Sequence, residues 1–415
     1  MYRATLSLLL AGAGSALAAL QVDLTSSSSV KTAAKDLAFD VMSYYKGNQS
    51  GEIIGLIDRE PPSGDYYWWN SAVLWSTMID YWRYTGDDTY NTLAVEGITW
   101  QNGGKGNPFM LPNFTATAGN DDYGFWAMAA MQAVELDFPS APQGQPGWLE
   151  LAQGVFDFMV KRYSSEKACN GGLRWQVPPT NKGYEVKNTI SNAVFLNLGA
   201  RLARFTGNQT QGDWAEKTWT WLTTIGLIDG KSNVFDLTST ESNCTQINKL
   251  QTSYTAGVLL QAAAYMYNQT TDATQKTWQT RLTALADRTL AVFFARDGGV
   301  LSEISCEIGD KTTCTDDMRL FKGIALRTLA SAAQMAPFLR DTVAPKLKST
   351  AAAAVKACDG GLRGRECAFR WSDGDKGAAK LTGVREEMNA LSAVLVGGEW
   401  DGGVRVRDGR ERRGE

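Results

Sequence analysis

The fold is indicated by two similar stretches, Tyr84-Thr85-Gly86-Asp87 and Phe205-Thr206-Gly207-Asn208. In each stretch a glycine follows an apolar-periodic segment, and a polar residue precedes the next such segment. Glycine at this position adopts the left-handed conformation that ends a helix, and Asp or Asn caps the helix that follows. Both stretches therefore predict a turn between two antiparallel helices, and their recurrence predicts a chain of repeated helical hairpins.

Apolar residues recur at three- and four-residue spacing along most of the chain, with few alternating runs. This period predicts an all-α fold with about twelve helices. Hairpins joined by alternating short and long loops predict a six-hairpin toroid whose inner helices begin at the mouth, where a ligand would bind. The predicted helices span 28–46, 68–84, 88–101, 120–136, 147–163, 187–205, 211–226, 249–267, 274–294, 317–336, 339–357 and 382–396.

The two ends of the chain differ from its body. Residues 1–18 resemble a signal peptide, because Arg3 precedes an apolar run that ends in an A-x-A cleavage site. No later stretch approaches the roughly 20 uninterrupted apolar residues of a membrane span. Residues 19–397 contain no Pro- or Ser-rich linker and are predicted to form one domain. Residues 398–415 are rich in Arg, Asp, Glu and Gly, and we expect a disordered tail there.

Glycosylation motifs and cysteines indicate a secreted protein. Six cysteines permit three disulfides, and although the sequence leaves 15 connectivities open, short spacing favours two bonds and leaves a third pair. These pairs are Cys306 with Cys314, Cys358 with Cys367, and Cys169 with Cys244. No C-x-x-C pair is present, so we expect no metal site. Five Asn-x-Ser/Thr sequons predict N-glycosylation at Asn48, Asn113, Asn208, Asn243 and Asn268.

The composition excludes several classes of chemistry. The chain contains no histidine, which excludes Ser-His-Asp and Cys-His sites and imidazole zinc sites. A net charge of −3 gives no basic field for nucleic acid. We therefore expect acid/base chemistry by carboxylates, no cofactor, no nucleic-acid partner, and a monomer.

The run Gly119-Asn120-Asp121-Asp122, followed by Phe125 and Trp126, is the strongest candidate for chemistry. Glycoside cleavage uses two carboxylates, one to attack or stabilise the anomeric carbon and one to move the proton, and aromatic rings support sugar faces. The alternative is a helix cap, which Asn and Asp also favour. Two adjacent acids repel each other, so their pKa values separate, which suits one acid and one nucleophile.

Other candidate binding residues share one property, since each is an aromatic, amide or charged residue near a predicted helix start or glycine turn. Any one of them could equally be a core residue, a cap or a loop anchor. The candidates are Trp68, Trp69, Asn120, Phe125, Trp126, Arg174, Trp175, Tyr184, Lys187, Asn188, Asn192, Asp236, Gln251 and Tyr254.

These motifs, in order, resemble fungal glycoside hydrolase family 76, the group of Dfg5-like and Dcw1-like mannan endo-1,6-α-mannosidases. The resemblance covers nearly the whole mature chain. Its pieces are Tyr67-Trp68-Trp69, Ile79-Asp80-Tyr81-Trp82 through Asp87, Gly119 to Asp122 with Phe125-Trp126, Gly171 to Gln176, Lys187-Asn188 with Ile190-Ser191-Asn192, Asn243-Cys244-Thr245, Ala264 to Asn268, and Phe321-Lys322.

The resemblance implies an (α/α)6 barrel and a retaining mechanism on α-1,6-linked mannose. It also implies that Asp121 is the nucleophile and Asp122 the general acid/base. Fungal members are associated with transferring GPI-anchored proteins to wall glucan, so the expected partners are α-1,6-mannan or a GPI-core glycan, with a β-glucan as acceptor. The expected location is the cell surface or wall.

The chain departs from the family pattern at Asn70-Ser71-Ala72, Tyr123-Gly124 and Thr252. Because such changes near the aromatic cluster could impair turnover, the alternative is a catalytically weak mannan-binding cell-wall protein. Relatives often end in a hydrophobic GPI-attachment signal, whereas this sequence ends Arg410-Glu411-Arg412-Arg413-Gly414-Glu415, which does not fit one.

Overall fold

The structure is a computed structural model and describes residues 19–104, 106–111, 117–296, 298–308, 311–371 and 381–398. The predicted signal peptide, the sequon at Asn113 and the predicted tail after residue 398 lie outside the described residues.

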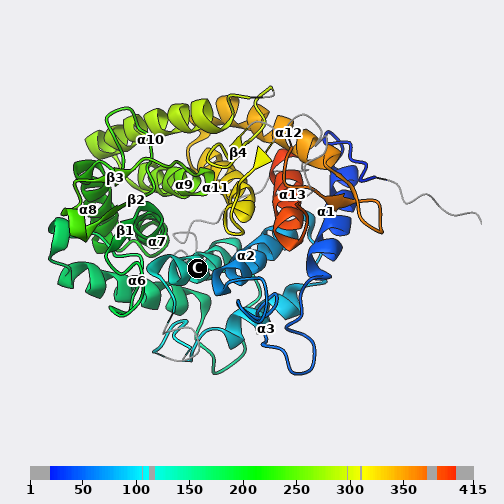
Figure 1. Cartoon of the computed structure of the whole chain (residues 1–415), viewed down its shortest axis with the longest axis horizontal. Helices are drawn as coiled ribbons and strands as arrows, with labels where there is room; N and C mark the ends of the chain where they lie inside the picture. Colours follow the sequence, from blue (N-terminus) through cyan, green and yellow to red (C-terminus); the bar gives the residue numbers. More distant parts are fainter. Residues whose placement is uncertain are drawn as a thin grey trace, which may run out of the picture.

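An inner ring of six helices surrounds the axis of the described fold. Each helix contacts the next in the chain, and the last contacts the first, so the ring is closed (Figure 1). The inner helices are α2 (Trp68–Thr85), α5 (Asn120–Leu136), α7 (Thr189–Thr206), α9 (Ser253–Gln269), α11 (Phe321–Met335) and α13 (Val384–Gly397).

An outer helix packs against each position of this ring and runs back toward the next inner helix (Figure 1). The outer helices are α1 (Ser27–Met42), α3 (Asn91–Trp100), α6 (Trp148–Ser165), α8 (Gln209–Ile225), α10 (Asp272–Phe293) and α12 (Arg340–Lys356). Six inner and six outer helices make an (α/α)6 barrel, and each of the twelve predicted helices has its counterpart.

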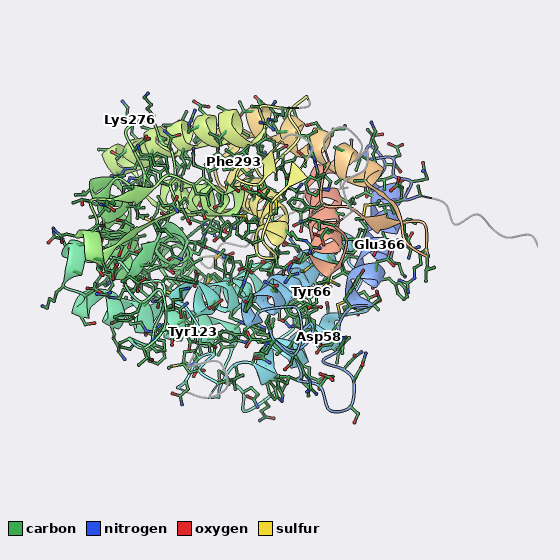
Figure 2. All side chains as sticks on the ribbon, in the orientation of Figure 1. Asp58, Tyr66, Tyr123, Lys276, Phe293 and Glu366 are labelled. Atoms are coloured by element: carbon green, nitrogen blue, oxygen red, sulfur yellow. A yellow bond between two sulfur atoms is a disulfide. The ribbon has the colours of Figure 1, made fainter. Side chains whose placement is uncertain are left out.

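Burial follows the sequence pattern of each layer. The inner helix α7 is buried from Thr189 to Arg204, because α5, α6, α8 and α9 pack around it. The outer helix α8 buries one stripe, which includes Ala215, Trp219 and Leu222, at the three- and four-residue spacing of an amphipathic helix. Figure 2 shows the same contrast, with Tyr123 of α5 inside the fold and Lys276 of α10 projecting outward.

Glycines fix the hairpin turns that the sequence predicts. Gly86 and Gly207 follow α2 and α7 in the left-handed conformation, with φ values of 76° and 74°. Their N–H groups donate to the carbonyls of Trp82 and Ala203, which satisfies the helix ends. Each turn thus ends an inner helix and starts the return to the outer layer.

Short strands connect the helices. Strands β1 (Val186–Asn188), β2 (Leu237–Ser239) and β3 (Ile247–Asn248) form an antiparallel sheet in that order. Two antiparallel pairs complete the set, β4 (Glu307–Ile308) with β5 (Lys311–Thr312), and β6 (Cys358–Gly360) with β7 (Glu366–Cys367). Short 3-10 helices lie at η1 (Ala168–Asn170), η2 (Thr240–Ser242), η3 (Met318–Leu320) and η4 (Pro337–Leu339).

Seven predicted helix starts are wrong by two to four residues, and for three of them the structure shows the cause. The segment predicted at 187–205 begins as strand β1, because Lys187 and Asn188 pair with Thr238 and Leu237 of β2. Helix α9 begins at Ser253 and not at 249, because the chain first forms strand β3. Helix α11 begins at Phe321 and not at 317, because the tighter turn η3 precedes it.

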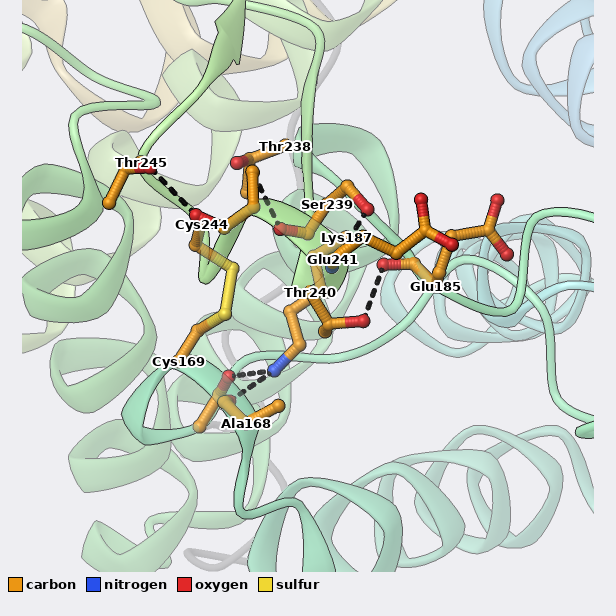
Figure 3. The surroundings of a disulfide bond; sticks show 12 residues. Ala168, Cys169, Glu185, Lys187, Thr238, Ser239, Thr240, Glu241, Cys244 and Thr245 are labelled. Carbon is orange, nitrogen blue, oxygen red and sulfur yellow. Dashed lines mark hydrogen bonds between the residues drawn. A yellow bond between two sulfur atoms is a disulfide. The ribbon is translucent and has the colours of Figure 1, made fainter.

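The structure contains the three expected disulfides, Cys169–Cys244, Cys306–Cys314 and Cys358–Cys367. The first joins η1 to the loop after η2, and the buried amine of Lys187 donates to the carbonyl of Ala168 beside it (Figure 3). Among the described helices, none has the length and apolar character of a membrane span.

Candidate active site

A cleft of about 530 Å³ opens where the inner helices begin. Residues at or just before the first turns of α2, α5, α7, α9 and α11 line it, as the toroid predicts. The described lining includes Glu60, Tyr67, Trp68, Trp69, Asp121, Asp122, Phe125, Trp175, Gln176, Asn188, Asp236, Tyr254, Asp317 and Phe321.

Asp121 and Asp122 lie in the first turn of α5 and face this cleft. Oδ2 of Asp122 accepts a hydrogen bond of 2.6 Å from the N–H of Gly119, so Asp122 does cap the helix. Oδ1 of Asp121 accepts one of 3.1 Å from the N–H of Asp122, and its Oδ2 accepts one of 3.0 Å from Nδ2 of Asn188. Capping of α5 by Asp122 is therefore compatible with a position of both side chains in the cleft.

The surroundings perturb the two carboxyl groups in different ways. Burial raises the pKa of Asp121 to about 7, while the hydrogen bonds from Asn188 and from the N–H of Asp122 act to lower it. Burial, followed by the charge of Asp121, raises the pKa of Asp122 well above its usual value. More donors support the ionised form of Asp121, so a proton held by the pair resides on Asp122.

Gly119 and Asn120 join the start of α5 to the loop that carries Arg174 and Trp175. A Cβ on Gly119 would clash with Oδ1 of Asp121, so a side chain at this position would displace the Asp121 carboxylate. Asn120 donates from its backbone to the carbonyl of Trp175 and from Nδ2 to that of Arg174, both at 2.8 Å. Oδ1 of Asn120 accepts a hydrogen bond of 2.8 Å from Arg162 of the outer helix α6. Asn120 thus positions the segment that carries Trp175.

Four aromatic rings from four inner elements form one wall of the cleft. The ring of Trp69 lies 5.1 Å from that of Phe125, between centroids. Phe125 lies 6.3 Å from Tyr254, and Tyr254 stacks on Phe321 at 3.6 Å. Flat rings in this arrangement suit the apolar faces of sugar residues.

Two carboxylates that support the tryptophans are not among the candidates predicted from the sequence. Oε1 of Glu60 accepts a hydrogen bond of 2.7 Å from the N–H of Trp68, and Oδ1 of Asp317 accepts one of 3.1 Å from Nε1 of Trp69. Glu60 lies in a loop without a recognisable motif. Asp317 stands at the start of a predicted inner helix, and the same rule that singled out Asp121 could have found it.

The structure brings together in the cleft nine of the sixteen candidates named from the sequence. Asp236 is one of them, and burial raises its pKa to about 6. The nine are Trp68, Trp69, Asp121, Asp122, Phe125, Trp175, Asn188, Asp236 and Tyr254.

The other candidates lie outside the cleft lining, and for most of them the structure gives a supporting contact. Asn120 holds the rim segment, and Asn192 exchanges two hydrogen bonds with the backbone of Leu173. Trp126 is fully buried and packs against Trp68. Gln251 is half-buried beyond the lining.

Three charged or aromatic candidates, Arg174, Tyr184 and Lys187, form one supporting cluster. Arg174 pairs with Glu166 at 2.5 Å and lies over the ring of Tyr184 at 4.4 Å. Lys187 is buried, and burial lowers its pKa to about 8. Its amine donates to the carbonyls of Ala168 and Gly171, next to the Cys169–Cys244 bond. These side chains hold the loops behind the cleft.

Comparison with known proteins agrees with this geometry. The profile described as glycosyl hydrolase family 76 matches residues 29–397. The chain belongs to glycosyl hydrolase family 76. Two relatives from Saccharomyces cerevisiae, named mannan endo-1,6-alpha-mannosidase DCW1 and DFG5, are 38% and 36% identical to it. Each match covers 91% of this family 76 chain, and 81% and 79% of the two relatives.

Solved structures of family 76 share the fold. The crystal structure of Dfg5 from Chaetomium thermophilum in complex with glucosamine matches with a TM-score of 0.84 and 44% identity. That match covers 91% of this chain and 92% of the other. An inactive variant of an alpha-1,6-mannanase from a Salegentibacter species, in complex with alpha-1,6-mannotetrose, matches with a TM-score of 0.67 and 20% identity. That match covers 89% of this chain and 98% of the mannanase chain. At this level of identity it shows only that the two proteins share the barrel fold.

Proposed function

We propose that this protein is a retaining endo-α-1,6-mannosidase or transglycosidase, with Asp121 as nucleophile and Asp122 as general acid/base. The observation that carries the proposal is the pair of carboxyl groups in one aromatic cleft. Hydrogen bonds favour an ionised Asp121, whereas burial and the charge of Asp121 favour a protonated Asp122. Membership of a glycosyl hydrolase family supports the reaction class.

The reaction has two steps. Asp121 attacks the anomeric carbon of a mannose while Asp122 gives its proton to the departing glycosidic oxygen, which leaves a covalent glycosyl-enzyme. Asp122, now ionised, takes a proton from an incoming hydroxyl group as that oxygen displaces Asp121. Water as the incoming group gives hydrolysis, and a sugar hydroxyl gives transfer.

The proposed substrates are α-1,6-mannan and the mannose core of a GPI glycan, with a β-glucan as acceptor. The names of the DCW1 and DFG5 relatives support the α-1,6-mannoside. The glucosamine bound to the Chaetomium Dfg5 supports a glycan that contains this amino sugar.

The proposed setting is the fungal cell surface, where the protein would act in cell-wall biogenesis. Three disulfides support an oxidising, extracellular compartment. Of the proposed glycosylation positions, Asn48, Asn208, Asn243 and Asn268 are exposed, as a glycan requires. The side chain of Asn208 also caps α8, and that of Asn268 donates to the carbonyl of Met335.

The test is mass spectrometry of the products from an α-1,6-mannooligosaccharide, with and without a laminari-oligosaccharide acceptor. Hybrid products that disappear in Asp121→Asn and Asp122→Asn variants would support a transglycosidase, and shorter sugars alone would support a hydrolase. Intact substrate together with calorimetric binding of the oligosaccharide would replace the proposal with that of a mannan-binding wall protein.

A further inference from the structure

Two rings of the aromatic wall, those of Tyr254 and Phe321, belong to the first turns of α9 and α11, which pack against each other (Figure 1). The ring centroids are 3.6 Å apart, and the ring planes meet at 11°. Both residues line the cleft. The shape of this part of the wall therefore depends on how the starts of the two helices are held.

Glu303, from the loop before β4, takes the place of a side-chain cap at the start of α9. Thr252 occupies the N-cap position, but its hydroxyl pairs with that of Thr255 and caps no N–H group of the helix. The fully buried carboxyl group of Glu303 instead accepts hydrogen bonds from the N–H of Ser253 at 3.1 Å and from its Oγ at 2.5 Å. A carboxylate at this end of a helix satisfies a free N–H group and suits the helix dipole. Glu303 thus fixes the residue directly before Tyr254.

A second buried carboxyl group joins the same loop to α11. Oε1 of Glu307 accepts a hydrogen bond of 2.8 Å from the N–H of Glu303. It also pairs at 2.9 Å with the amine of Lys322, the residue directly after Phe321. Lys322 is fully buried, and its amine lies 4.0 Å from the centroid of the Phe369 ring. These contacts connect the start of α9 to the start of α11 behind the two stacked rings.

The hold of Glu303 on Ser253 depends on hydrogen-bonding groups more than on charge. Burial raises the pKa of Glu303 to about 7, although the hydrogen bonds from Ser253 lower it, and the charge of Glu307 raises it further. The ionised form accepts both bonds from Ser253. A protonated carboxyl group, like an amide, still has an oxygen that accepts the N–H bond. Glutamine at position 303 should therefore preserve the contact.

We propose that Glu303 is a positioning residue for sugar binding, because it fixes the start of α9 so that Tyr254 stacks on Phe321 and presents its ring to the cleft. Glu303 lies outside the described lining of the cleft, so it would act on the sugar only through Tyr254. The inference rests on the proposed function for the identity of the sugar. Loss of the carboxyl group should weaken sugar binding.

The test measures binding of α-1,6-mannotetraose to the full chain by calorimetry. All proteins carry Asp121→Asn, so that the sugar is not consumed. The added changes are Glu303→Leu, which removes the acceptors at similar volume, Glu303→Gln, Tyr254→Leu, and Glu303→Leu combined with Tyr254→Leu. The matched control is Glu387→Leu, since Glu387 is also buried, lies outside the described cleft lining, and accepts a backbone N–H bond from Cys367.

We expect Glu303→Leu and Tyr254→Leu each to weaken binding about three- to tenfold, as the loss of one aromatic contact would give. The double variant should bind no more weakly than Tyr254→Leu alone, because Glu303 acts through that ring. Glu303→Gln and Glu387→Leu should bind within about twofold of the parent protein. Additive losses in the double variant, or an equal loss for Glu387→Leu, would overturn the proposal.

If Glu303→Leu does not fold, Ser253→Pro takes its place. Proline suits the first position of a helix, and Thr252 before it already has the extended backbone that a following proline favours. The change removes both groups that Glu303 holds. A loss of about three- to tenfold supports the assignment, and unchanged binding overturns it.

Hydrogen exchange followed by mass spectrometry separates this inference from the proposed function, because it needs no ligand. Amides in the first turn of α9 should exchange faster in Glu303→Leu, or in Ser253→Pro, than in Glu387→Leu. Equal exchange there overturns the positioning role. Cleavage of the mannotetraose by the wild type tests the proposed function alone, and a wild type that binds this sugar without cleaving it leaves the role of Glu303 supported.

Discussion

Nδ2 of Asn188 donates a hydrogen bond of 3.0 Å to Oδ2 of Asp121, so the residue that caps α7 also holds the proposed nucleophile on α5. The same side chain accepts, through Oδ1, a hydrogen bond from the N–H of Ser191. One amide therefore couples two neighbouring inner helices at the mouth of the barrel.

Replacing Asn188 with alanine should raise the pKa of Asp121 above its value of about 7, because the bond from Asn188 lowers that pKa. Since the nucleophile must be ionised, the acidic limb of the kcat/KM profile should move to higher pH. We expect kcat/KM near neutral pH to fall about 10- to 100-fold, the loss of one hydrogen bond to a charged group. A pH series of initial rates checks this.

The control for that variant is Ser26→Ala, which removes the side-chain cap of α1 far from the cleft. It should cost a comparable amount of stability, about 1 kcal/mol, with an unchanged pH profile. Equal pH profiles for Asn188→Ala and the wild type would show that Asn188 acts only as a cap.

Ionisation of Asp122, the proposed acid/base, should lower the free energy of unfolding at high pH. Burial raises the pKa of Asp122 above the ordinary 3.8, so its favourable contribution to folding is present below that value and is lost as pH rises through the folded pKa. Asp122→Asn removes the ionisation but can still accept from Gly119. We expect its unfolding midpoint to exceed that of the wild type by roughly 2 °C at pH 8, with no gain at pH 4.

Thermal unfolding followed by circular dichroism at several pH values measures this difference. Asp316→Asn is the matched control, since its side chain is 64% exposed and paired at the surface, and it should show no gain that grows with pH. A gain for Asp122→Asn that is independent of pH would contradict the buried, protonated carboxyl group.

The Cys169–Cys244 bond should stabilise the protein more than the Cys306–Cys314 bond. Their sequence separations are 75 and 8 residues, and a longer closed loop restricts the unfolded chain more. Replacing both cysteines of the first pair with alanine should cost about 4 kcal/mol. The same change in the second pair should cost about 2 to 3 kcal/mol. Denaturant unfolding of the two double variants provides the comparison, and the reverse order would refute it.

Trp175 should bind substrate through its ring. The side chain is 37% exposed at the rim of the cleft, while its backbone bonds to Val186 and Asn120 do not depend on the indole. Trp175→Ala should raise KM roughly three- to tenfold with little change in kcat, because a stacking contact is lost. Trp100→Ala removes an indole of similar exposure, 42%, outside this lining, and should leave both constants unchanged.

Much of the fold could be predicted because the spacing of apolar residues and the residues that cap a helix are local features of the sequence. The glycines at 86 and 207 end their helices in the left-handed conformation that the motif implies. The start of α7 could not be read from the sequence, because Lys187 and Asn188 form a strand only through their pairing with β2, about 50 residues later in the chain.

The candidate site was predicted in part for the same reason. Helix starts can be recognised, so Trp69, Asp121 and Tyr254 were found. Whether a polar residue faces the cleft or a neighbouring loop depends on tertiary packing, and Arg174 and Lys187 face loops. Glu60 was missed because its role depends on the N–H of Trp68 and not on a local pattern.

The proposed mechanism requires that Asp121 forms a covalent bond to the sugar. The most direct measurement is peptide mapping by mass spectrometry after incubation with a ring-fluorinated α-mannosyl fluoride, whose fluorine slows breakdown of the intermediate. We predict one added fluoromannosyl group, located on Asp121, and none on the Asp121→Asn variant. A label on Asp122 or Asp236, or an unlabelled protein that still releases fluoride, would contradict the account.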